Sequence, residues 1–169
     1  MKQEEVDVVI IGAGPAGSIA AAYLHKGNIS VKVVEKMKFP RLVVGESLLP
    51  RSMDRFDEAG LLEPLKKYNF QVKSGARFVR DELICEFDFS KKFGTGWDWT
   101  WQIPRADFDK AITDELQRKG VNIAFETEVI AVEPNKGNCL TIIKNKENTE
   151  SIIRSKYIID ASGYGRVLP

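Results

Sequence analysis

The segment from Val6 to Glu35 constrains the fold more than any other part of the chain. A nearly continuous run of branched apolar residues ends at Gly12, which is typical of a parallel strand covered on both faces. The glycine pattern GAGPAG begins there, and a second apolar run, residues 31–34, ends at Glu35. Because a crossover between parallel strands is right-handed, the chain is expected to open with a strand, a glycine turn, a helix and a parallel strand.

The helix between these strands is predicted from its ends and its periodicity. Pro15 favours a helix start, and Gly27 favours a helix end. The spacing i, i+3, i+4, i+7 and i+8 predicts an inward-facing stripe made of Ala16, Ile19, Ala20, Tyr23 and Leu24.

Each glycine of the GAGPAG pattern has a distinct steric role. Gly12 permits the tight turn, Gly14 lets the backbone approach a pyrophosphate, and Gly17 lets the helix pack closely on the strand. The N-terminus of the helix offers N–H groups to the phosphate. Glu35 can accept hydrogen bonds from ribose hydroxyls, and its charge disfavours a 2′-phosphate. The pattern predicts a dinucleotide site, and a glycine turn without a ligand is the alternative.

The rest of the chain predicts a loop over residues 36–50 and then further helices and strands. Pro50 begins a short helix whose inward positions are Met53 and Phe56, and a second helix follows Pro104. Alternation places Trp97, Trp99 and Trp101 on one face of a strand. The other predicted strands are residues 76–80, 83–89, 121–125, 128–132, 140–144, 151–154 and 157–160.

Composition narrows the classes of function. The 169 residues contain 25 Lys and Arg against 24 Asp and Glu, which argues against a nucleic-acid partner. The apolar runs are too short for an integral membrane segment, and the N-terminus lacks a secretory pattern, so a cytoplasmic location is expected. Cys85, Cys139 and His25 are too few and too far apart for a thiol pair, a metal cluster or a Ser-His-Asp triad.

Several segments resemble the FAD-dependent aromatic-hydroxylase superfamily: GAGPAG, the unit that ends at Glu35, IPRADFD and IIDASG. Within it, FPRLVVGESLLP, KSGARF and WTWQIP are similar to flavin-dependent halogenases and to geranylgeranyl-reductase-like oxidoreductases. The resemblance implies an α/β fold, a Rossmann-like FAD-binding domain with a doubly wound parallel sheet and a three-stranded β meander. It divides the chain into residues 1–45 and 102–169 of that domain and residues 46–101, the start of an inserted β-rich substrate domain. The chain is expected to be a fragment that lacks a C-terminal part.

The resemblance also implies which residues contact FAD. Arg41 and Arg105 would contact the phosphate and ribityl region, Glu35 the adenosine ribose, and Ser47 the isoalloxazine ring. The remaining contacts would come from Gly12, Gly14, Pro15, Ala16 and Gly17 at the pyrophosphate, from Val129 at the adenine, and from Ala161 and Gly163 at the pyrophosphate or adenine end. Ser162 stands where hydroxylases carry an Asp before the glycine, which favours the halogenase branch.

Lys73 resembles the halogenase lysine that stands between flavin and substrate and meets hypohalous acid. A solvated surface charge is the alternative. The implied function is an FAD-dependent oxidoreductase that acts through reduced flavin on an organic substrate, aromatic or isoprenoid, by halogenation or monooxygenation. Alkene saturation and a non-catalytic flavin- or nucleotide-binding module are the alternatives. The expected partners are a small-molecule substrate and an electron donor, either NAD(P)H or a separate flavin reductase.

Overall fold

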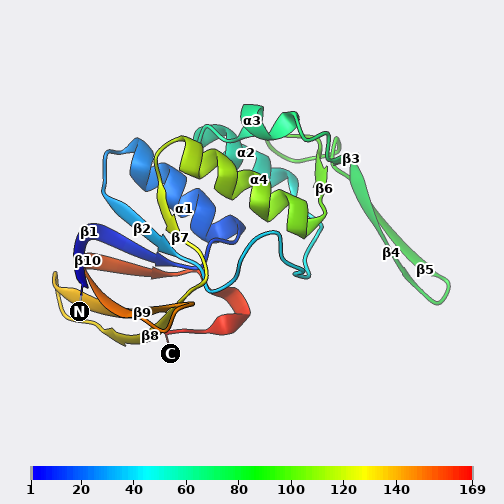
Figure 1. The fold of residues 1–169 in the computed structure, drawn as a ribbon. Coiled ribbons are helices and arrows are strands. Elements are labelled where there is room, and N and C mark those ends of the chain that lie inside the picture. Colours follow the sequence, from blue (N-terminus) through cyan, green and yellow to red (C-terminus); the bar gives the residue numbers. More distant parts are fainter. Residues whose placement is uncertain (1, 169) are drawn as a thin grey trace.

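The computed structural model describes residues 2–168, which are built around a six-stranded mixed sheet (Figure 1). The strand order is β7-β2-β1-β10-β9-β8. The strands are β1 (Lys2–Ile11), β2 (Val31–Val34), β7 (Asn122–Ala124), β8 (Thr127–Glu133), β9 (Cys139–Asn145) and β10 (Glu150–Asp160). The first four in this order are parallel, and β8, β9 and β10 form an antiparallel meander. This arrangement confirms the predicted α/β class.

Strand β1 is covered on both faces, as the apolar run predicts. On one face Ile10 contributes to a large core with the helices α1 (Pro15–Lys26) and α4 (Arg105–Arg118). On the other face Val9 packs in a second cluster with Ile143 of β9. Strands β2 and β8 lie far apart in the strand order yet contact each other, so the sheet curls and the meander covers the second face.

Helix α1 packs on the core with most of the predicted stripe, but its most buried residues lie beside that stripe. Its buried residues are Gly17, Ser18, Ala21 and Ala22, whereas Ala16 is exposed and Ile19, Ala20, Tyr23 and Leu24 are half-buried. Small side chains let the helix lie close to the sheet, and the larger apolar ones fill the space at its flanks. The hydrophobic stripe therefore identified residues that contact the core, but it missed the most buried positions of the helix.

The two predicted strands at residues 151–154 and 157–160 are one continuous strand, β10. Its register with β1 runs from Ser151 to Asp160. The polar residues between the two apolar runs do not interrupt the strand, because the backbone pairing with β1 continues through Ser155 and the Lys156 ammonium lies 2.6 Å from the Asp7 carboxylate on β1. The third strand of the meander is thus also the parallel partner of β1.

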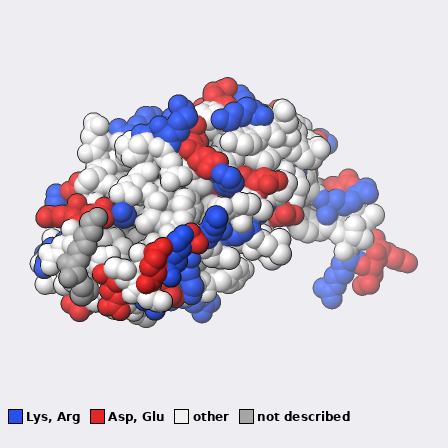
Figure 2. Space-filling view, in the orientation of Figure 1, with Lys and Arg blue, Asp and Glu red and all other residues white. Residues whose placement is uncertain are grey.

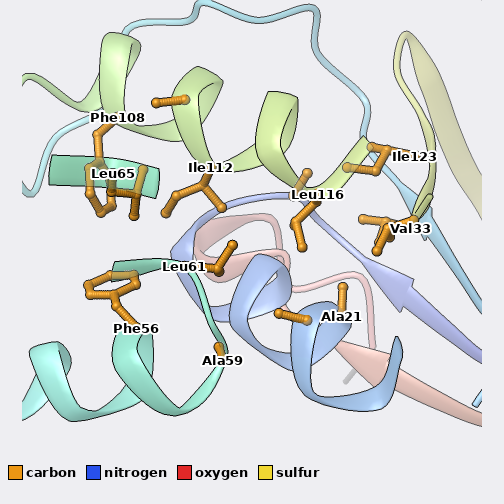
Figure 3. Close-up of a cluster of buried hydrophobic side chains, with 14 of the residues drawn as sticks. Ala21, Val33, Phe56, Ala59, Leu61, Leu65, Phe108, Ile112, Leu116 and Ile123 are labelled. Atoms are coloured by element: carbon orange, nitrogen blue, oxygen red, sulfur yellow. The ribbon is translucent and has the colours of Figure 1, made fainter. Parts of the chain in front are cut away.

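The helices α1, α2 (Pro50–Glu58), α3 (Leu62–Lys66) and α4 build the core above the sheet (Figure 3). Phe108 and Ile112 of α4 point toward the two shorter helices α2 and α3, whereas Leu116 lies over Ala21 of α1. The Phe108 ring meets the ring of Phe56 edge-on, with 5.5 Å between centroids. As predicted, Met53 and Phe56 face inward and are buried.

The strands β4 (Gly75–Arg80) and β5 (Leu83–Asp88) form a hairpin that projects from the body of the molecule (Figure 1). Next to its base, β3 (Gln71–Lys73) pairs with β6 (Thr100–Gln102). The predicted tryptophan strand is wrong in extent, because Trp97 and Trp99 precede β6 in irregular chain that follows Gly94 and Gly96. Their rings still meet edge-on in a row with Trp101.

The division into residues 1–45, 46–101 and 102–169 stays a prediction. Met53, Leu61 and Leu65 of the middle range belong to the same buried cluster as β1 and α4. On the face shown in Figure 2, acidic and basic side chains are interspersed over the helices and along the projecting hairpin. No helix within residues 2–168 is long and apolar enough to cross a membrane.

Candidate functional site

The glycine turn between β1 and α1 is held by close backbone contacts. Gly12 has φ +98°, and its N–H donates a hydrogen bond to the Val34 carbonyl at 2.8 Å. A Cβ at Gly12 would lie 2.6 Å from the Ala161 carbonyl oxygen, and one at Gly17 would lie 2.0 Å from the Gly12 carbonyl oxygen. Any side chain at these two positions would therefore force the turn open.

Gly14 differs from the other two glycines, because the space in front of it is bounded by positive charge. It is the N-cap of α1, and no side chain of the described residues caps this helix. A Cβ there would lie 3.6 Å from Arg41 Nη2 and 3.9 Å from Arg105 Nη2. The start of a helix and two guanidinium groups thus surround one small space, which suits an anion with two charges such as a pyrophosphate.

Arg41 reaches this space from the loop that follows β2. Its Nη1 lies 3.5 Å from Glu35 Oε1, and its Nη2 lies 3.6 Å from Asp109 Oδ2. The guanidinium also stacks 4.6 Å from the centroid of the Phe39 ring. Among the described residues its buried Nε has no hydrogen-bond partner. A buried donor without a partner is costly, so a further acceptor at this point would stabilise the arrangement.

Arg105 is the first residue of α4 and is held more tightly. Its Nε and Nη2 donate to the two oxygens of Asp109 at 2.8 and 2.9 Å. Its Nη1 donates to the carbonyls of Val44 and Gly45 at 3.1 and 3.4 Å. Asp109 is not among the residues predicted from the sequence, although its position four residues after Arg105 on a helix is a recognisable ion-pair spacing.

Glu35 lies at the end of β2 and is only 3% exposed. Its Oε2 accepts a hydrogen bond from the Ala13 N–H in the glycine turn, and its Oε1 accepts one from the Met37 N–H, both at 2.9 Å. With the Arg41 contact described above, this carboxylate joins the glycine turn to the arginine loop. Its contact with a ribose stays a prediction.

The end of β10 completes the wall behind the glycine turn. The Ala161 N–H donates to the Ile11 carbonyl at 2.9 Å, and Gly163 begins the short 3-10 helix η1 (Gly163–Gly165) with φ +62°. Burial raises the pKa of Asp160, but hydrogen bonds from Ser162 and the Leu168 N–H outweigh burial and hold this pKa below its ordinary value.

Lys73 and Ser47, which the sequence analysis singled out separately, meet in the structure. The Lys73 ammonium donates to Ser47 Oγ at 2.5 Å and to the Leu48 carbonyl at 3.3 Å. It also lies 5.4 Å from the centroid of the Phe89 ring. Because Arg105 holds the same loop at Gly45, residues 44–48 link the arginine pair to the lysine.

The expected site residues therefore fall into two groups joined by one loop. Gly12, Gly14, Gly17, Glu35, Arg41 and Arg105 surround the start of α1, with Pro15 and Ala16 in its first turn, and Ser47 and Lys73 form a pair. Val129 belongs to neither group: it lies on β8, at a bulge, and its half-buried side chain packs against the second cluster, which includes Val34. The ligand contacts of all these residues stay predictions.

Comparison with known proteins identifies relatives along most of the chain. Residues 5–167 match the family described as FAD binding domain. A 1H-pyrrole-2-carbonyl-[peptidyl-carrier protein] chlorinase from Pseudomonas fluorescens is 33% identical over 96% of this chain and 40% of its own length.

Two solved structures share the fold. A flavoprotein/dehydrogenase from Cytophaga hutchinsonii is 50% identical, with a TM-score of 0.93 over 98% of this chain and 41% of its own. The flavin-dependent halogenase CmlS is 33% identical, with a TM-score of 0.86 over 98% of this chain and 30% of its own. These findings confirm the resemblance to flavin-dependent halogenases. The chain spans about 40% of the length of the chlorinase.

Proposed function

Because the chain belongs to the FAD binding domain family, whose cofactor is FAD, we propose that the protein is an FAD-dependent oxidoreductase of the halogenase type. Membership of this family confirms the cofactor expected from the sequence. The observation that carries the proposal is the loop of residues 44–48, which Arg105 holds at one end and Lys73 at the other. This loop connects the anion-binding space at α1 to a cation suited to chemistry on a halogen.

The residues around α1 would hold the FAD pyrophosphate. The N-terminus of α1 contributes backbone donors, and Arg41 and Arg105 contribute charge and directed N–H groups. Glu35 orients the glycine turn and Arg41, and we propose that it also accepts a hydrogen bond from the ribose. FAD would supply the redox chemistry when bound, and its reduced form can react with O2.

Lys73 would act on the substrate side of the loop. Two of the three donors of its ammonium group are directed to Ser47 and Leu48, which leaves one N–H that could donate to the oxygen of a hypohalous acid. The half-buried Trp97 and Trp99, which pack in a row on the buried Trp101, would offer an apolar surface that excludes water from such a species. The proposed substrate is an aromatic compound, and a separate flavin reductase is the proposed electron donor.

A dehydrogenase or reductase is the second candidate function. The solved relative that is 50% identical to this chain is named a flavoprotein/dehydrogenase. Reduction of a substrate by reduced flavin, such as alkene saturation, uses the same cofactor site but has no need for the Lys73 cation.

The two functions are separated by Lys73→Ala in the full-length protein. The assay supplies reduced FAD, O2, and chloride or bromide with phenols and indoles, and mass spectrometry detects the halogen isotope pattern. For a halogenase, the Lys73→Ala variant binds FAD normally but forms no halogenated product, whereas exposed Lys91→Ala is unaffected. Halogenation by the Lys73→Ala variant at the wild-type rate would refute this role. Substrate reduction without O2 by wild type and variant alike would favour the second candidate.

The cofactor site is tested by Gly14→Val. The added side chain would stand between the start of α1 and the two guanidinium groups, in the space assigned to the pyrophosphate. The variant is expected to purify without flavin. The absorbance of the purified protein in the visible flavin bands measures its flavin content. Full flavin occupancy would mean that the glycine pattern serves only as a turn.

A further inference from the structure

Two arginines at one site repel each other unless a negative group compensates their charges. The Asp109 carboxylate contacts both Arg41 and Arg105 and can compensate them. Its side chain is fully buried on the inner face of α4. One oxygen accepts from Arg105 Nε at 2.8 Å, and the other accepts from Arg105 Nη2 at 2.9 Å and lies 3.6 Å from Arg41 Nη2. A buried carboxylate is costly unless cations and donors compensate it, and here both guanidinium groups contribute.

We propose that Asp109 is a positioning residue, which orients Arg105 and Arg41 so that their Nη2 groups face the pyrophosphate space at Gly14. This inference rests on the proposed FAD site and adds to it a residue that does not itself touch the cofactor. The two-point contact with Arg105 defines the plane of that guanidinium group. A single contact would leave it free to rotate.

The contacts on the other side of Arg105 extend this role to the loop. With its Nε and Nη2 directed to Asp109, Arg105 points Nη1 at the carbonyls of Val44 and Gly45. A Cβ at Gly45 would lie 3.3 Å from this Nη1, so the loop backbone approaches the guanidinium closely. Asp109 therefore fixes the orientation of Arg105, which contacts both the proposed cofactor space and the loop leading to Lys73.

The first test compares Asp109→Asn with Asp114→Asn in the full-length protein. Both aspartates lie on α4 and pair with a cation four residues away, but Asp114 is half-exposed and pairs with Lys110 at 2.6 Å. Asparagine cannot accept two N–H groups through two charged oxygens. Asp109→Asn is expected to raise the Kd for FAD by about tenfold or more. Asp114→Asn should leave this Kd unchanged.

Two further measurements separate positioning from a purely structural role. Asp109→Glu keeps the charge, so among folded variants it should restore FAD affinity toward wild type. In an Arg105→Ala background, Asp109→Asn should weaken FAD binding by a smaller factor than in the wild type, because the arginine held by two hydrogen bonds is gone and only the longer contact with Arg41 remains. Circular dichroism of the flavin-free proteins verifies that each variant is folded.

The outcomes are distinguishable from failure of the proposed function. If the wild-type protein binds no FAD, the cofactor site itself is wrong. If the wild type binds FAD and Asp109→Asn binds it equally well, the positioning role is overturned and the site stands. The positioning role is also overturned if Asp109→Asn weakens binding by the same factor with and without Arg105.

Discussion

The β1–α1–β2 unit and the β4–β5 hairpin are both short, locally connected structures with apolar strands, yet they bury those strands very differently. Val9 and Ile10 of β1 are 0% exposed, whereas Phe78 of β4 and Ile84 of β5 are 62% and 59% exposed. Strand β1 has a partner on each side and is packed on both faces, but β4 and β5 pair only with each other among the described residues. Apolar composition alone therefore does not determine burial.

Because the two regions differ in burial, substitutions in them should differ in their effects on stability and on flavin binding. The β1–α1–β2 unit carries the core and the glycine turn, so changes there should alter folding and flavin binding together. The hairpin lies outside the core and next to Phe89 and Lys73, so changes there should leave global stability almost unaltered.

The largest expected effect comes from the same substitution made in each region. Ile10→Ala removes a fully buried side chain from the sheet and is expected to reduce the free energy of unfolding by about 2–5 kcal/mol. Ile84→Ala on the hairpin should change it by less than about 0.5 kcal/mol. Urea denaturation followed by circular dichroism measures both. Equal losses would mean that the hairpin is part of the cooperative core.

The next largest effect is expected from replacing a glycine by alanine in each region. Gly17→Ala would place a Cβ 2.0 Å from the Gly12 carbonyl oxygen, so the turn must shift, at an expected cost of about 3 kcal/mol in unfolding free energy. Gly94, near the hairpin, has no atom within 4 Å of the equivalent position. Gly94→Ala is therefore the control, and the melting temperatures of the two variants compare them. A Gly17→Ala protein as stable as wild type would contradict the close packing of the turn.

Removal of one carboxylate in each region should affect the Kd for FAD differently. Glu35→Ala removes the acceptor for the Ala13 N–H and the partner of Arg41, and is expected to weaken FAD binding by about 2 kcal/mol, or about 30-fold in Kd. Glu86→Ala removes a partner of Arg77 on the hairpin surface and should leave this Kd unchanged. Fluorescence titration with FAD measures both. Identical dissociation constants for Glu35→Ala and wild type would refute the role of Glu35.

The smallest effect is a dependence on pH. Hydrogen bonds hold the pKa of Asp160, beside the glycine turn, and that of Asp88, at the hairpin, below their ordinary values. A carboxyl whose folded pKa is lowered stabilises the fold above its unfolded pKa of about 4 and loses this contribution as the pH falls further.

Asp160→Asn should therefore be less stable than wild type at pH 7, and the difference should shrink as the pH falls below about 4. Asp88→Asn should match wild type at both pH values, because the hairpin opens locally without unfolding the core. Urea denaturation at pH 7 and pH 3 tests this. A constant difference for Asp160→Asn at both pH values would show that its charge plays no part.

The sequence by itself determined the elements whose signals are local. The apolar runs on either side of GAGPAG, the helix start at Pro15 and the buried positions Met53 and Phe56 all follow from residue type and short-range spacing. The family resemblance followed in the same way, since its motifs are contiguous. Such features need no knowledge of distant partners, because strand and helix preferences act within a few residues.

Tertiary structure alone decided which distant residues meet. Arg41, Arg105 and Asp109 come together at Gly14 because the loop after β2 and the start of α4 both reach the end of the glycine turn. The pairing of Ser47 with Lys73 likewise depends on where the loop passes β3. The Arg105–Asp109 pair has a local helical spacing, but the contacts of Arg41 with Asp109 and of Ser47 with Lys73 depend on packing of the whole core, and no spacing along the chain encodes them.

Long-range packing also explains where the sequence-based predictions for α1 and β10 differ from the structure. The most buried positions of α1 are small residues that approach the sheet closely, and a hydrophobic stripe does not identify them. Strand β10 runs through Ser155 and Lys156 because β1 supplies pairing along its length and Asp7 supplies a charge partner. Local polarity indicated a break at these residues, and the neighbouring strand removed it.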